Sequence, residues 1–162
     1  MEDTLRDIDG VLDRLDAVAA DVASNGSIDA KAASAELLDL SEFVLERWVE
    51  ARDMTPTRDK SEGFRLLALH RQGAKGEPSF NACRETCREI VYQHNVVAAA
   101  GQPERALVAL GLQVMVLRHL ALFIAGKLQV AGLGEFCCAS KPLRAGGDGK
   151  PEKTDNMQGA LT

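Results

Sequence analysis

The stretch CRETCREIVYQHN, residues 83–95, holds the residue types in this chain that are best suited to chemistry. Two cysteines stand four residues apart, and a histidine follows seven residues after the second. Thiolate and imidazole groups bind soft transition metals such as Zn, Cu or Fe, and a thiol pair can also carry redox chemistry. Cys83, Cys87 and His94 are therefore the first candidates for a metal or ligand site.

The spacing around these residues predicts a helix with one apolar face. Members of that face recur in steps of three and four, and they are Phe80, Cys83, Cys87, Ile90, His94 and Val97. Side chains four residues apart on a helix lie about 6 Å from each other, so both sulfurs can reach one soft metal ion. His94 lies about 10 Å beyond Cys87 along the axis, too far for all three to share an ion easily. Further donors would come from His70, His119 or the pair Cys137 and Cys138.

A plain structural interpretation competes with the metal site. Free cysteine is among the most buried residue types and packs as a small hydrophobic side chain. A histidine on an apolar face is commonly satisfied by a carbonyl or carboxylate of a neighbouring element. The same six residues can therefore be no more than the buried stripe of a helix in a bundle.

The two cysteines and the histidine are similar to the motif of the all-α AhpD-like peroxidase-reductase family. That motif places CxxC on a helix, with a histidine four residues later. Here the cysteines are spaced C-x3-C, His94 follows seven residues on, and only about 13 residues are comparable. The resemblance implies thiol redox chemistry as the alternative function, with Cys83 and Cys87 as the reacting pair.

Other enzyme classes lack their motifs. A ferritin-like di-iron site uses Glu-x-x-His on helices, but the residues three before the histidines are Leu67, Val91 and Val116. No HExxH, GxSxG, P-loop or C-x-x-C-H pattern occurs. We therefore expect a noncatalytic accessory or regulatory protein that binds a protein partner, or a metal or small ligand, through the cysteine helix. The alternative is a thiol redox or metal-dependent enzyme that uses Cys83 and Cys87.

The stretch RQGAKGEPS, residues 71–79, is a candidate anion site. Glycines beside Arg71 and Lys75 run into the start of a helix, where backbone amides and positive charge can meet an anion. Such stretches are also common as connectors between the helices of a bundle. Both interpretations are open at the level of sequence.

The elements that must position these residues are all predicted to be helices. We expect them at about 3–23, from Ser27 or Asp29 to 54, and at 59–72, 78–100 and 103–131. The stripe of the first helix should be Leu5, Ile8, Leu12, Leu15, Ala19 and Val22. That of the second should include Leu37, Leu40, Val44 and Trp48, and the third should turn Phe64, Leu67 and Ala68 inward. Residues 1–140 thus form an all-α bundle of four long helices and one short helix. Residues 141–162, rich in glycine and poor in apolar residues, are expected to be a disordered tail.

Compartment and membrane contact follow from the apolar content and the cysteines. The uncharged run Ala106–Leu117 spans only 12 residues before Arg118, so residues 103–131 predict a nearly all-round buried helix of a soluble bundle rather than a membrane span. The acidic start MEDTLRDIDG does not resemble a secretory signal. Four cysteines without such a signal favour a reducing cytoplasm.

Charge is unevenly distributed along the chain, whose net charge is −5. Residues 1–53 hold 14 acidic and five basic residues, whereas residues 54–162 hold 10 and 14. This balance argues against nucleic acid as the main ligand, because a nucleic-acid footprint is a dense basic face. The acidic first half either neighbours the basic later helices or meets a basic protein partner. The heptad-like stripe of the first helix also allows a homo-oligomer.

Overall fold

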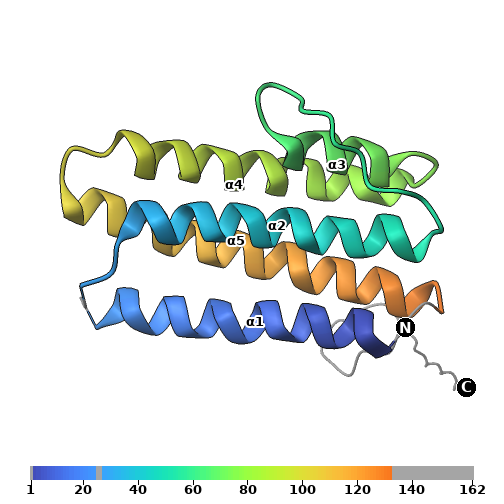
Figure 1. The fold of residues 1–162 in the computed structure, drawn as a ribbon, viewed down its shortest axis with the longest axis horizontal. Helices are drawn as coiled ribbons and strands as arrows, with labels where there is room; N and C mark the ends of the chain where they lie inside the picture. The colour runs from blue at the N-terminus through green and yellow to red at the C-terminus, as the bar shows by residue number, and fades with distance from the viewer. Residues whose placement is uncertain (1, 25–26, 133–162) are drawn as a thin grey trace, which may run out of the picture.

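The computed structural model describes residues 2–24 and 27–132, and these form an antiparallel bundle of helices (Figure 1). The long helices are α1 (Glu2–Ala23), α2 (Ala30–Ala51), α4 (Asn81–Ala99) and α5 (Pro103–Val130), and the short one is α3 (Arg65–Ala74). Successive long helices run in opposite directions, while α3 lies beside α2 and α4 at one end. The all-α bundle of four long helices and one short helix is confirmed. The predicted tail, 141–162, lies outside the described residues.

Local signals explain most helix boundaries. Asp29 is the N-cap of α2, and its carboxylate accepts a hydrogen bond from the Ala32 amide at 3.1 Å. Helix α2 ends at Ala51 rather than at 54, because Asp53 already has a positive φ of 61°. Pro78 opens a single 3-10 turn, η1 (Pro78–Phe80), and α4 begins directly after it. Pro103 occupies the first turn of α5 as expected.

The third helix begins later than the sequence indicated. Residues 53–63 form a loop instead of the first turn and a half of the predicted helix 59–72. Glu62 and Gly63 have φ angles of 55° and 86°, and Ser61 pairs with Phe64 through two backbone hydrogen bonds of 3.0 Å. These left-handed residues are incompatible with a continuing helix. The later start also changes the buried face, which is Leu66, Leu69, His70 and Gly73, while Phe64, Leu67 and Ala68 are half-buried.

The core lies between the four long helices and confirms two predicted stripes in part. On α1 the buried side chains are Ile8, Val11, Leu15 and Val18, whereas Leu12, Ala19 and Val22 are half-buried, so the predicted stripe was rotated. Nothing is described of the Leu5 side chain. On α2, Leu37, Val44 and Trp48 are buried as expected and Leu40 is half-buried. The stripe of α4 is buried from Phe80 to Val97, with His94 half-buried.

Helix α5 departs most from its predicted environment. It contacts α1, α2 and α4, and its inner face includes the buried Leu110, Leu117 and Ile124. Its outer face is nevertheless apolar, and Val108 and Met115 are each 65% exposed. The prediction of nearly all-round burial was therefore wrong. In the described part of the chain, α5 is also the helix whose length and composition would suffice to cross a membrane. Of its most apolar 18-residue stretch, 44% is buried in the bundle.

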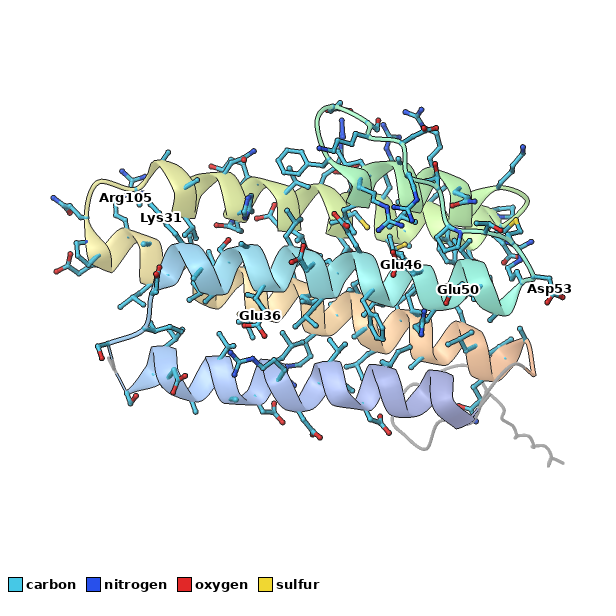
Figure 2. All side chains as sticks on the ribbon, in the orientation of Figure 1. Lys31, Glu36, Glu46, Glu50, Asp53 and Arg105 are labelled. Carbon is cyan, nitrogen blue, oxygen red and sulfur yellow. The ribbon has the colours of Figure 1, made fainter. Side chains whose placement is uncertain are left out.

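Ion pairs connect the acidic first two helices to the more basic later elements. Figure 2 labels Glu46 on α2, one of the acidic partners. Asp16 on α1 pairs with Arg118 on α5 at 2.8 Å. Arg65, at the start of α3, pairs with Glu42 and Glu46 on α2. The acidic helices thus do neighbour basic side chains of the same chain, as one of the two sequence interpretations expected. Exposed pairs of this kind contribute about 0–1 kcal/mol each, so they orient elements more than they stabilise them.

Candidate thiol site and basic cleft

Cys83 and Cys87 lie one turn apart on the buried face of α4. Their exposed fractions are 2% and 0%, and both are free thiols. Phe80 precedes them and Ile90 follows them on the same face, and both of these side chains are fully buried. The shared face predicted from their spacing is therefore present, and the neighbouring Cys87 thiol lowers the pKa of Cys83.

Close packing of α3 brings a histidine to this thiol pair. At Gly73 a Cβ atom would lie 3.1 Å from Trp48 Cδ1 and 3.2 Å from Phe80 Cε2, so a larger residue would require one of these rings to shift by a few tenths of an ångström. Trp48 Nε1 donates to the Gly73 carbonyl at 3.1 Å, which ties α3 to α2. As a result, His70, which lies one turn earlier on α3, packs against the start of α4 and is only 8% exposed.

His70 bridges the start of α4. Its Nε2 lies 2.9 Å from the Phe80 carbonyl oxygen, and since a carbonyl only accepts, Nε2 carries the proton. The ring also lies close enough to Cys83 for each group to shift the pKa of the other. Sequence analysis named His70 only as one of several donors that might approach the cysteines. Its spacing with Leu66, Leu69 and Gly73 on α3 was the signal that could have placed it on the buried face.

These contacts divide the two thiols electrostatically. The hydrogen bond from Cys87 is the main cause that lowers the pKa of Cys83 to about 6; His70 adds to it, and burial opposes it. The pKa of Cys87 is raised well above its ordinary value, first because its thiol donates to Cys83 and then because it is buried. Burial alone would lower the pKa of His70, but the hydrogen bonds to Cys83 and the Phe80 carbonyl raise it. Near neutral pH the pair therefore holds one proton between two sulfurs.

His94 belongs to a different cluster. Ser34 Oγ on α2 lies 2.9 Å from His94 Nδ1 and donates to Gln113 Oε1 on α5 at 2.6 Å. Because the serine proton is used on Gln113, His94 Nδ1 must donate to Ser34. Gln113 Nε2 returns a hydrogen bond of 3.1 Å to the Ser34 carbonyl. The structure thus separates His94 from the cysteines and ties three helices together through it.

The remaining sequence candidates do not join the thiols. His119 is exposed on the outer face of α5, and Cys137 and Cys138 lie outside the described residues. Within residues 2–24 and 27–132, no group of three or more His, Cys, Asp or Glu side chains could hold a metal ion. A four-ligand site of the zinc type therefore has no support among the described residues.

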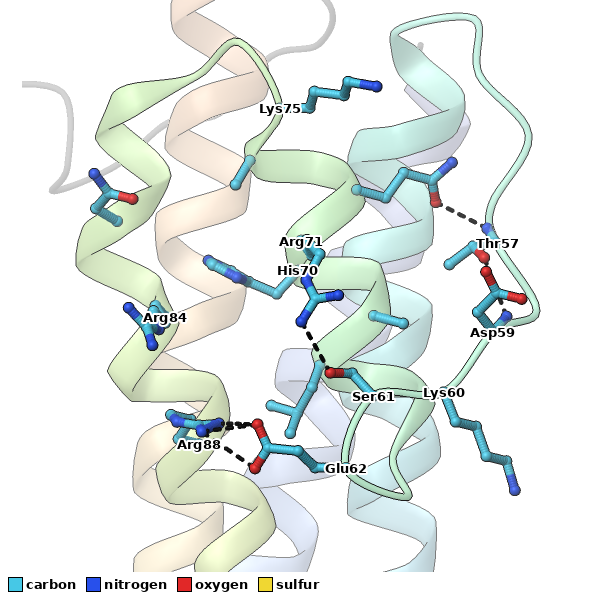
Figure 3. A pocket seen from close by; sticks show the side chains of 15 residues that line it. Thr57, Asp59, Lys60, Ser61, Glu62, His70, Arg71, Lys75, Arg84 and Arg88 are labelled. Carbon is cyan, nitrogen blue, oxygen red and sulfur yellow. Dashed lines mark hydrogen bonds and ion pairs between the residues drawn. The ribbon is translucent and has the colours of Figure 1, made fainter.

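Arg71 and Lys75, the predicted anion-binding pair, lie together on one cleft (Figure 3). The cleft lies between residues 57–62, α3 and the first half of α4, and its volume is about 970 Å³. Arg84 and Arg88 on α4 and Lys60 on the loop complete its basic lining. The spacing of residues along the chain did not predict that Arg84, Arg88 and Lys60 would join this cleft. Arg84 and Arg88 reach it only because α3 packs against α4.

Comparisons with models of protein families, with curated proteins and with solved structures give no match for this chain.

Proposed function

We propose that this protein is a noncatalytic binding protein whose thiol pair, Cys83 and Cys87, holds a soft monovalent metal ion of the Cu(I) type. The observation that carries the proposal is the pair of buried free thiols one helical turn apart on α4, of which Cys83 has a pKa lowered to about 6. A sulfur that is already largely thiolate at neutral pH is a ready metal ligand, because the thiolate form is the one that binds.

The number of donors favours Cu(I) over zinc. Soft thiolate ligands select Cu(I), and this ion forms stable complexes with only two thiolates. Zinc in structural sites takes four ligands, and the described residues offer no cluster of three. His70 hydrogen-bonds to Cys83, so it would orient that sulfur toward the ion. The ion would lie between two sulfurs that are one helical turn apart.

Helix geometry favours a bridging ion over a disulfide. The Cβ atoms of residues four apart on a helix lie about 5–6 Å from each other. A disulfide needs a Cβ–Cβ distance of about 3.5–4.5 Å, so joining Cys83 to Cys87 would require α4 to unwind locally. An ion inserted between the sulfurs lengthens the bridge and leaves the helix intact.

Thiol redox chemistry is the second candidate, and the lowered pKa of Cys83 is the observation that favours it. In that case the Cys83 thiolate attacks a disulfide or peroxide of a substrate, and Cys87 then attacks the sulfur of Cys83. The products are the Cys83–Cys87 disulfide and the reduced substrate, with two electrons transferred. Because both thiols are almost fully buried, this route needs α4 to open before a substrate can reach them.

A cytoplasmic location and a protein partner complete the proposal. Reducing conditions would keep the buried thiols free for the ion. Because the site is buried, a partner would exchange the ion at the end of the bundle where α3 meets the start of α4. The thiol pair best supports an accessory role, in which the protein stores the ion or delivers it.

The test is a Cu(I) titration of reduced protein under anaerobic conditions, in competition with a chromogenic Cu(I) chelator. We expect one equivalent to bind tightly to the wild type and to a Cys137→Ser, Cys138→Ser control. The Cys83→Ser, Cys87→Ser variant should lose that equivalent while its circular dichroism stays unchanged. Retention of the equivalent in this folded variant would overturn the proposal.

The same preparation separates the two candidates. Treatment of the metal-free protein with a disulfide or hydrogen peroxide, followed by mass spectrometry of its peptides, detects a Cys83–Cys87 disulfide. If this disulfide forms quickly and no Cu(I) is retained, the redox function replaces the metal-binding one.

A further inference from the structure

The basic cleft adjoins the thiol site, because His70 lines it as well, but its basic side chains carry an inference of their own (Figure 3). Five basic side chains line it, and only two acidic ones, Asp59 and Glu62, do so. The whole chain has a net charge of −5, so this local excess of positive charge runs against the overall charge of the protein. A cleft with one sign of charge concentrates ions of the opposite sign.

The basic groups differ in how far they are already satisfied. Arg88 makes a two-pronged ion pair with Glu62, with contacts of 2.9–3.2 Å, and Arg71 donates to Ser61 Oγ at 3.2 Å. Lys60, Lys75 and Arg84 line the cleft from the loop, the end of α3 and α4. All three are exposed, and none forms an ion pair with an acidic residue of the described chain. These three cations are available to a ligand.

The loop wall of the cleft is held in place before any ligand arrives. Gln72 accepts a hydrogen bond from the Thr57 amide and donates one to the Thr55 carbonyl, each at 2.8 Å. Arg65 Nε donates to the Thr57 carbonyl at 2.8 Å. The Thr57 hydroxyl in turn accepts from the Asp59 amide at 3.0 Å. A wall fixed by these bonds lowers the entropic cost of binding.

We propose that this cleft binds a small phosphorylated molecule. Its volume of about 970 Å³ falls in the range of small-molecule sites, which is about 300–1,000 Å³, and exceeds the needs of a single inorganic ion. Guanidinium groups match phosphate oxygens in a two-pronged geometry, and Arg84 offers one that has no acidic partner among residues 2–24 and 27–132. Lys60 on the loop and Lys75 at the end of α3 add point charges to the lining, and Asn81 adds an uncharged amide.

The test uses pyrophosphate as the probe in isothermal titration calorimetry at low salt. The Lys75→Ala, Arg84→Ala variant removes two of the unpaired cations. Its matched control is Lys31→Ala, Arg105→Ala, which removes the same two residue types from exposed positions at the opposite end of the bundle (Figure 2). We expect the first variant to lose at least about tenfold in affinity and the control to lose less than about twofold, because distant exposed charges are screened.

Two further arms make the outcome decisive. Citrate replaces pyrophosphate to present carboxylates, and equal affinity for citrate would overturn the choice of phosphate. The Cys83→Ser, Cys87→Ser variant should bind pyrophosphate as the wild type does, so that failure of the thiol proposal and failure of this one are told apart. Absence of pyrophosphate binding to the wild type, or an equal loss in both cation variants, would refute the cleft as a ligand site.

Discussion

His70 and His94 are both held between helices of the same bundle, but their partners give them different properties. His94 donates to a serine hydroxyl that is itself fixed by Gln113. His70 donates to a backbone carbonyl and hydrogen-bonds to a thiol. Serine and glutamine do not ionise near neutral pH, whereas a thiol does. The partners of His94 therefore serve to hold helices together, whereas the thiol beside His70 can also lose a proton and bind an ion.

Burial alone does not distinguish the two clusters, because both lie at helix contacts. The clusters differ in how firmly each proton is held by its donor. In the His94 cluster the Ser34 hydroxyl, His94 Nδ1 and Gln113 Nε2 each have a defined acceptor, so the arrangement is fixed. In the His70 cluster Cys87 keeps its proton, whereas Cys83 loses its own at a pH of about 6. A candidate site in a buried polar cluster is thus recognised by a group that loses its proton near neutral pH.

The largest expected effect is on the pH dependence of Cu(I) binding. Between pH 6 and 8 only Cys87 must lose a proton, so affinity should rise about tenfold per pH unit; below pH 6 both thiols must, giving about a hundredfold per unit. From pH 5 to 7 the affinity should therefore increase about a thousandfold. Competition titrations at several pH values measure the slope, and a flat profile would contradict the division of protons.

Gln113→Leu should show the next largest effect, and on stability alone. The substitution leaves the Ser34 hydroxyl without its acceptor in a fully buried position and removes a second hydrogen bond. We expect the free energy of unfolding to fall by about 2–3 kcal/mol in urea denaturation. Cu(I) affinity of the folded variant should stay within about twofold of the wild type. A loss of Cu(I) affinity without destabilisation would show that the clusters are coupled.

Cys87→Val removes the donor that does most to lower the pKa of Cys83. We expect the pKa of Cys83 to rise from about 6 toward its ordinary value, by at least about one unit, which corresponds to about 1.4 kcal/mol. Thiolate absorbance in the ultraviolet follows this titration. A Cys137→Ser, Cys138→Ser background removes the other thiols from the signal. An unchanged midpoint would mean that Cys87 does not hydrogen-bond to Cys83.

His70→Asn should raise the pKa of Cys83 by less than Cys87→Val does. The imidazole contributes to the low pKa of Cys83, but its contribution ranks below that of the Cys87 thiol. The same absorbance titration compares the two variants directly, with His94→Asn as the matched control that leaves the pKa of Cys83 unchanged. A larger rise in His70→Asn than in Cys87→Val would reverse the ranking.

His119→Ala should have the smallest effect. This side chain is exposed and belongs to neither cluster, so the free energy of unfolding should change by less than about 0.5 kcal/mol. Cu(I) titration should still give one equivalent. A lost equivalent would bring His119 back as a ligand through a contact between two molecules.

Sequence periodicity predicted the buried face of α4 and most of that of α2, but it did not predict which residues meet across helices. The α4 stripe from Phe80 to Val97 was predicted correctly, because local spacing determines a helix face. The pairing of Cys83 with His70 was not, because it depends on the contact of Gly73 with Trp48 and Phe80. The late start of α3 was missed for a similar reason. The loop before α3 is held by hydrogen bonds from side chains of α3 itself, and the helix propensities of the loop residues do not reflect these bonds.

Gln72 has a consequence for how the loop can be released. Its carboxamide accepts from one peptide group and donates to another in residues 55–57, as the backbone of a neighbouring strand would in a sheet. The Gln72 side chain thus makes the two hydrogen bonds that one residue of a neighbouring strand would make to this segment. Limited proteolysis of Gln72→Ala should therefore cut first between residues 53 and 63, at a site that the wild type protects.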